Sequence, residues 1–151
     1  MEHQGNHRLR IGRFSEAGRS YLLTTTTRNR APLFAHLRFA RAVIQQLRLS
    51  EQEGTCQSLA WVLMPDHLHW LVELRQGSLS SLMRAFKSRS SCALFRAGTD
   101  RQRVWQPGYH DRALRRDEDV KAAARYIIAN PIRAGLVRRA GEYSHWDCVW
   151  L

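Results

Sequence analysis

The sequence has few cysteines, very little lysine and no long apolar run. Its three cysteines, Cys56, Cys92 and Cys148, lie far apart and never form a C-x-x-C pair. This spacing argues against a disulfide framework and against a thiolate zinc site, and we expect three small buried thiols. The longest apolar stretches, such as residues 59–65, fall far short of the roughly 18 residues that a membrane-spanning helix needs. Because no signal-type apolar segment follows Met1, we expect a soluble, cytoplasmic protein without a membrane partner.

The size and composition are those of one globular domain. The chain has 151 residues, of which 44% are hydrophobic and 25% are charged, a balance typical of packed proteins rather than of disordered chains. No internal repeat or long low-complexity tract divides it, so we expect a single domain over residues 1–151. Residues 1–18 are polar and predict a loose lead-in, whereas residues 138–151 have no clean hydrophobic period and predict an irregular tail.

Positive charge dominates and is concentrated in one part of the chain. Only Lys87 and Lys121 are lysine among the 24 basic residues, and the formal net charge is +11. Residues 75–139 contain 15 basic and 5 acidic residues, a net charge of +10. Guanidinium groups bind phosphate through two donors and also stack on bases. The clustering therefore favours a polyanionic partner, above all nucleic acid, over a merely solvated basic surface.

Hydrophobic periodicity and turn residues predict alternating strands and helices. The expected strands are residues 19–27, 59–64, 67–74 and a bent strand over 104–105 and 109–114; the expected helices are residues 33–52, 78–95 and 117–129. This β-α-β-β-α-β-α order is that of the ferredoxin-like split β-α-β sandwich. We therefore expect an α+β fold with an antiparallel sheet, helices on one face, the other face free for a ligand, and an extra C-terminal helix.

The strand expected at residues 67–74 has one polar and one apolar face. Trp70 belongs to the apolar face, where side-chain alternation predicts core packing. His67 and His69 share the opposite face, about 6.5–7 Å apart at the backbone, so their imidazoles can converge on one cation. The alternative for an isolated H-x-H is a pair of surface or core histidines without a metal. The tight turn before the pair and the apolar face behind it favour the metal interpretation.

The last expected helix carries a candidate nucleophile. Tyr126 lies away from the centre of the apolar stripe formed by Val120, Ala124 and Ile127, so it is not placed as a core-filling ring. Neighbouring alanines leave room for a substrate, and Asn130, four residues later, lies near the same edge of the helix. This pattern fits an ordinary hydrogen-bonded tyrosine and a catalytic tyrosine equally well.

Three ordered motifs resemble a known family. They are residues 61–71 (WVLMPDHLHWL), 105–115 (WQPGYHDRALR) and 124–137 (ARYIIANPIRAGLV). These motifs are similar to the signatures of the REP-associated tyrosine transposases, which are single-tyrosine HUH endonucleases, and the resemblance covers nearly the whole chain. It implies metal-dependent cutting and rejoining of single-stranded DNA at hairpins of repetitive extragenic palindromes, by transesterification through a 5′-phosphotyrosine intermediate.

The resemblance also implies roles for individual residues. His67 and His69 match the HUH pair that holds a divalent ion, and Tyr126 matches the catalytic nucleophile on the extra helix. Asn130 matches the polar residue one turn later, the expected third metal ligand, where related insertion-sequence enzymes commonly have glutamine. The ion would be Mg²⁺ or Mn²⁺, and imidazole ligands favour Mn²⁺. Related enzymes are dimers, but the REP-associated group acts as monomers, so we favour a monomer with a dimer as the alternative.

DNA contacts are expected mainly from the basic half of the chain. The candidates are Arg84, Lys87, Arg89, Arg112, Arg115 and Arg116 for phosphate, Trp105, Tyr109 and Trp146 for base stacking, and His110 as a proton carrier or hairpin contact. Two other classes stay open: a module that binds single-stranded DNA hairpins without cutting them, and an RNA-hairpin-binding domain of the same architecture. Intact His67, His69 and Tyr126 count against the first class, and the missing glycine-aromatic signature counts against the second.

Overall fold

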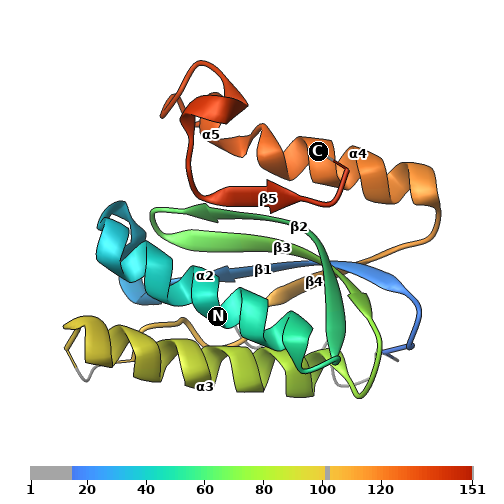
Figure 1. The fold of residues 1–151 in the computed structure, drawn as a ribbon, viewed down its shortest axis with the longest axis horizontal. Helices are drawn as coiled ribbons and strands as arrows, with labels where there is room; N and C mark the ends of the chain where they lie inside the picture. The colour runs from blue at the N-terminus through green and yellow to red at the C-terminus, as the bar shows by residue number, and fades with distance from the viewer. Residues whose placement is uncertain (1–14, 101–102, 151) are drawn as a thin grey trace.

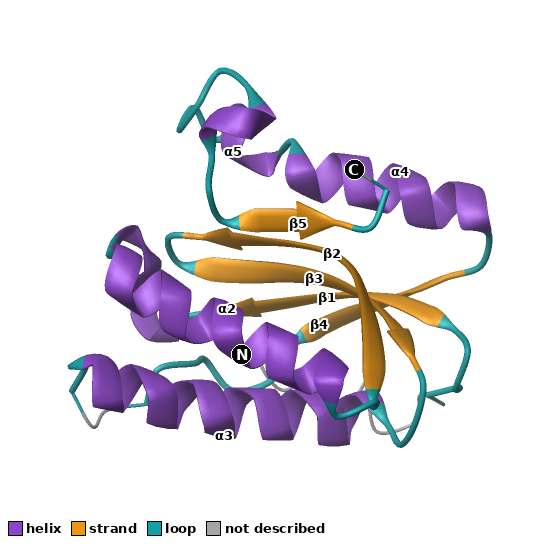
Figure 2. Ribbon diagram, viewed as in Figure 1, coloured by secondary structure: helices purple, strands orange, loops and turns teal. Residues whose placement is uncertain are grey.

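The computed structural model describes residues 15–100 and 103–150. Its centre is a five-stranded antiparallel sheet between two layers of helices (Figures 1 and 2). The strands are β1 (Ser20–Thr26), β2 (Cys56–Met64), β3 (His67–Leu74), β4 (His110–Leu114) and β5 (Trp146–Cys148), in the spatial order β4-β1-β3-β2-β5. The helices are α2 (Leu37–Gln52), α3 (Leu79–Ala97), α4 (Asp117–Ile128) and the short α5 (Asn130–Arg133). The order of the elements confirms the expected ferredoxin-like α+β fold.

Local sequence signals explain where α3 begins and ends. The Ser78 hydroxyl accepts a hydrogen bond from the Ser81 amide at 3.1 Å, and the Ser81 hydroxyl accepts one from the Ser78 amide at 3.2 Å. This reciprocal capping box satisfies two donors that the first turn of a helix leaves free. Gly98 follows the helix with φ 117°, a left-handed conformation that suits glycine. Helix α2 starts later than expected, because residues 33–35 form a separate 3-10 turn.

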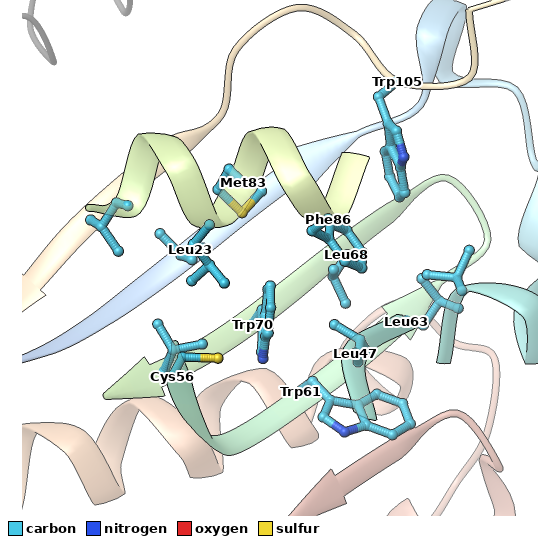
Figure 3. Packing of buried hydrophobic residues seen from close by; sticks show 14 of the residues in the cluster. Leu23, Leu47, Cys56, Trp61, Leu63, Leu68, Trp70, Met83, Phe86 and Trp105 are labelled. Atoms are coloured by element: carbon cyan, nitrogen blue, oxygen red, sulfur yellow. The ribbon is translucent and has the colours of Figure 1, made fainter. Parts of the chain in front are cut away.

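One face of the sheet packs against α2 and α3 around large aromatic side chains (Figure 3). The ring centroid of Trp70 lies 5.2 Å from that of Phe86, which in turn lies 5.9 Å from that of Trp105. The Trp70 indole donates to Ser58 and the Trp105 indole donates to Ser90, each at 2.8 Å. Both buried donors therefore have partners. The predicted core position of Trp70 is confirmed by its full burial.

The other face of the sheet packs against α4, which lies on the side opposite α2 and α3 (Figure 1). Leu71 of β3 and Val62 of β2 are buried with Ala123, Ala124 and Ile127 of α4. The helix thus covers part of the face that we expected to be free. The sheet surface left for a ligand is therefore smaller than we expected from the alternation along β3. The reason is that the apolar stripe of α4 packs against this face of the sheet.

The C-terminal segment contains a strand that the sequence does not predict. The expectation of an irregular tail over residues 138–151 is wrong where Trp146–Cys148 form β5, which pairs with Ala60, Trp61 and Val62 of β2. Three residues are too short to show a hydrophobic period, and β5 forms because it satisfies the exposed backbone edge of β2. Most of the predicted lead-in, residues 1–14, lies outside the described residues.

The cysteines only partly follow the expectation of buried thiols. Cys56 and Cys148 are buried, and burial, followed by the charge of Glu51, raises the pKa of the Cys56 thiol to about 12. Cys92 is exposed, which corrects the prediction. Its position on α3 lies outside the buried stripe of that helix. Within the described part of the chain, no helix has both the length and the apolar character needed to cross a membrane.

Candidate active site

Strand β3 brings two imidazoles together on the face that α4 covers. The ring centroids of His67 and His69 are 4.9 Å apart, and the rings meet edge to face with an interplanar angle of 84°. Leu71, two residues further along β3, is buried against α4 on this same face. The alternation of the strand therefore points the histidine pair toward the helix that carries the candidate nucleophile.

Each imidazole is held through its Nδ1 atom. His67 Nδ1 lies 2.7 Å from the carboxylate oxygen Oδ1 of Asp66, and His69 Nδ1 lies 2.9 Å from the hydroxyl of Thr24. The second contact follows from the sheet register, in which Thr24 of β1 is paired with His69 of β3. A partner at Nδ1 restrains the ring and leaves Nε2 as the atom suited to binding a metal ion.

The surroundings of His69 keep its imidazole neutral. Burial, and then electrostatic repulsion from His67 and Arg133, lowers the pKa of His69 from 6.5 to about 4. The neutral form retains the nitrogen lone pair with which an imidazole binds a cation. Near neutral pH, His69 therefore has the protonation state of a metal ligand.

The start of α5, just after α4, brings an amide to the histidine pair. Asn130 Nδ2 lies 3.4 Å from His67 Nε2, although the two residues are 63 positions apart in the sequence. The side-chain oxygen Oδ1 of Asn130 accepts a hydrogen bond from Arg133 at 3.4 Å. The side-chain amide would therefore have to rotate by about half a turn to offer this oxygen to a cation. Among residues 15–100 and 103–150, no three histidine, cysteine or acidic side chains cluster to hold a metal. Asn130 is thus the side chain in position to add to the two imidazoles.

Tyr126 lies one helical turn before Asn130 and is open to solvent. Its side chain is 61% exposed, so a polymer can reach the phenol oxygen. The guanidinium carbon of Arg133 lies 3.8 Å from the centroid of the Tyr126 ring. Arg133 was not among the candidates drawn from the sequence. Its spacing of seven residues from Tyr126 and three from Asn130, typical of one helix face, was a signal that pointed to it.

Lys87 and Arg89, two of the expected phosphate contacts, are engaged within the fold. Lys87 Nζ donates to the backbone carbonyls of Gln106, at 2.9 Å, and Gly108. It thereby ties α3 to the segment that precedes β4. Arg89 forms an ion pair with Glu53 and so connects α3 with the end of α2.

Trp105 is not available for the base stacking that we expected of it. An isolated bridge pairs its backbone with Thr27, and its side chain is only 3% exposed in the aromatic core. Tyr109 also packs against the edge of this core, and Trp146 packs against the α4 core. Long-range packing, which sequence spacing does not reveal, explains why these rings turn inward.

The remaining DNA-contact candidates are exposed and lie on different elements of the fold. They are Arg84 on α3, Arg112 on β4, and Arg115 and Arg116 between β4 and α4. His110 of β4 is exposed too. In the sheet register, His110 lies opposite Thr24 of β1, and Thr24 in turn lies opposite His69 of β3. Since neighbouring strands are about 4.8 Å apart, the backbone of His110 lies about 10 Å from that of His69, on the same face.

Comparison with known proteins identifies the family to which the chain belongs. Residues 17–130 match the family of IS200-like transposases. The chain belongs to the IS200-like transposase family. A REP-associated tyrosine transposase of Escherichia coli (strain K12) is 30% identical to it over 88 residues, which are 56% of this chain and 49% of that relative. The chain thus spans about half the length of the curated relative that it matches.

Solved structures of this kind share the fold. A REP-associated tyrosine transposase bound to a REP hairpin superposes with a TM-score of 0.71 and 25% identity, over 89% of this transposase and 79% of that chain. A proposed transposase from Deinococcus radiodurans R1 is similar in fold alone, with a TM-score of 0.57 and 23% identity over 79% and 95% of the two chains. The predicted resemblance to REP-associated tyrosine transposases is confirmed.

Proposed function

We propose that this transposase cuts and rejoins single-stranded DNA at REP-like hairpins, with Tyr126 as the nucleophile. The observation that carries the proposal is the 3.4 Å contact between Asn130 and His67. Through this contact, the short helix α5 that directly follows the Tyr126 helix meets the strand that bears both histidines. We therefore assign the histidine pair, as the metal-binding motif, and the segment with Tyr126 and Asn130, as the nucleophile motif, to one site.

The proposed DNA partner is supported by charge and by a relative. The chain has a formal net charge of +11, which favours association with a phosphate backbone. The solved REP-associated tyrosine transposase that shares this fold is bound to a REP hairpin. We therefore choose a DNA hairpin with a single-stranded flank as the substrate class.

The donor set fits a divalent cation, Mg²⁺ or Mn²⁺. His67 and His69 would hold it through the Nε2 atoms that their Nδ1 partners leave free, and Asn130 would add its amide oxygen after the amide turns. When bound, such an ion polarises the phosphoryl group and neutralises the charge that builds up on it. The low pKa of His69, set mainly by burial, keeps this ligand unprotonated over most of the physiological pH range.

The chain's own residues account for the covalent step. The Tyr126 oxygen attacks phosphorus, the bond from phosphorus to the 3′ oxygen breaks, and that oxygen leaves as a 3′-hydroxyl. The phenol proton passes to water, and the leaving oxygen takes up a proton. The product is a 5′-phosphotyrosine, whose ester bond a second 3′-hydroxyl can attack in the reverse sense without ATP. The exposure of Tyr126 gives a DNA strand the access that this step requires.

The test is covalent capture of a labelled DNA hairpin with a single-stranded flank, in the presence of Mn²⁺. We expect a protein–DNA band that survives denaturation and that disappears in Tyr126→Phe, whereas Tyr109→Phe, the matched control, retains it. Tyr126→Phe should still bind the hairpin. An undiminished adduct in Tyr126→Phe would assign the nucleophile elsewhere. Hairpin binding by the unsubstituted protein without any adduct would favour a binding module, and tighter binding of an RNA hairpin would favour an RNA partner.

A further inference from the structure

Arg133 contacts both polar residues at the end of the tyrosine helix. Its guanidinium lies against the ring of Tyr126, 3.8 Å from the ring centroid, and donates to the amide oxygen of Asn130 at 3.4 Å. No residue of the described part of the chain forms an ion pair with Arg133, which is exposed.

The break between α4 and α5 explains this placement. Ala129 alone separates the two helices, and Pro131 is accommodated in the first turn of α5, where a missing amide hydrogen costs no hydrogen bond. The Ala134 amide then donates to the Asn130 carbonyl, which closes the turn. Arg133 therefore lies on the same side as Tyr126, in a segment too short to hold it through packing.

The contact restrains a side chain that otherwise has few neighbours. Tyr126 is 61% exposed, so little protein surrounds its ring and fixes its rotamer. A guanidinium over an exposed aromatic ring stabilises that arrangement through a cation–π interaction. The second contact, to Asn130, orients the guanidinium, because its planar donors have fixed directions.

We propose that Arg133 is a positioning residue for the strand-transfer reaction. It holds the Tyr126 ring in one orientation and fixes the Asn130 amide, so that the nucleophile and the polar group beside His67 are ordered together. This inference rests on the proposed role of Tyr126 as the nucleophile. Arg133 would orient the exposed phenol of Tyr126 for the reaction.

The experiment measures the single-turnover rate of adduct formation at saturating DNA hairpin and Mn²⁺. Arg133→Met keeps most of the side-chain length and removes the charge and the planar donors. We expect the rate to fall about ten- to hundredfold, the size of effect that misplacing a reacting group produces. The dissociation constants of the hairpin and of Mn²⁺ should change little. Arg133→Lys should recover part of the rate.

Arg138→Met is the matched control, because Arg138 is exposed and changes the net charge equally. It should react at the unsubstituted rate. An unchanged rate in Arg133→Met overturns the inference, and so does a defect confined to hairpin affinity, which would make Arg133 a simple phosphate contact. Melting temperatures verify folding, and Arg133→Gln serves as a second uncharged variant. If Tyr126→Phe retains the adduct, the proposed function fails. If Tyr126→Phe loses the adduct but Arg133→Met reacts at the unsubstituted rate, this inference alone fails.

Discussion

The two faces of the sheet are built from different side chains. On the α2 and α3 side, Trp70, Phe86 and Trp105 form a continuous aromatic core (Figure 3). On the α4 side the buried residues are mainly aliphatic, and the polar contacts of His67 and His69 lie at the end of this layer. The face toward α2 and α3 therefore contributes a buried aromatic core, whereas the face toward α4 combines an aliphatic core with a polar site.

A single strand serves both purposes. His69 and Trp70 are consecutive residues of β3, yet the imidazole meets Thr24 and the indole meets Ser58 on opposite faces. The site is therefore supported from behind by the buried aromatic core. Changes on the aromatic face should lower stability, and changes on the α4 face should affect metal binding and chemistry more than stability.

The largest effect is expected from Trp70→Ala. Removing this fully buried ring should lower the free energy of unfolding by about 3–5 kcal/mol. Trp150→Ala is the matched control, because that ring is 42% exposed and should matter by about 0.5 kcal/mol or less. Urea denaturation measures both values. Equal losses in the two variants would contradict the assignment of stability to the aromatic face.

The metal-free protein should lose stability as the pH falls from 6.5 toward 4. The folded pKa of His69 is about 4, lowered mainly by burial, so the unfolded chain binds a proton in this range before the folded chain does. Protons therefore favour unfolding, by up to about 3 kcal/mol for this group. Urea denaturation in EDTA at several pH values should show a weaker pH dependence in His69→Gln. Parallel curves for the two proteins would refute the prediction.

Overpacking the α4 face should couple stability with chemistry. Ala124 is 2% exposed between α4 and the sheet, and Ala124→Leu should cost about 1–3 kcal/mol. By displacing the helix, the change should also slow adduct formation by Tyr126. Ala122→Leu, on the exposed side of the same helix, should leave the free energy of unfolding nearly unchanged. A destabilised Ala124→Leu with a normal reaction rate would show that the site tolerates movement of α4.

The smallest effect on stability is expected from Thr24→Val. The variant removes the hydroxyl that holds His69 Nδ1 and should weaken Mn²⁺ binding about 10–100-fold, with a modest change in unfolding free energy. Thr25→Val is the matched control, because the neighbouring Thr25 hydroxyl is buried without a hydrogen-bond partner in the described part of the chain. Calorimetric titration with Mn²⁺ measures the affinity. Equal affinities for both variants would remove Thr24 from the site.

Local patterns predicted much of this architecture. Alternation along β3 placed His67 and Trp70 on opposite faces, and capping and turn residues predicted the α3 start and the β2–β3 hairpin. Other features depend on distant partners. Trp105 is buried under α3, Lys87 binds carbonyls near β4, and Arg89 pairs with Glu53, so none of these three follows from its own neighbours in the chain.

Local sequence patterns account for the order of the elements, the faces of β3 and the residue types of the site, because helical and strand periods are properties of the local backbone. Tertiary structure alone decided that Asn130 meets His67 and that Arg133 covers Tyr126. The first contact joins residues 63 positions apart and depends on how α4 packs on the sheet, and the second depends on the turn between α4 and α5. Periodicity is encoded residue by residue, whereas contacts between elements arise only when the whole chain packs.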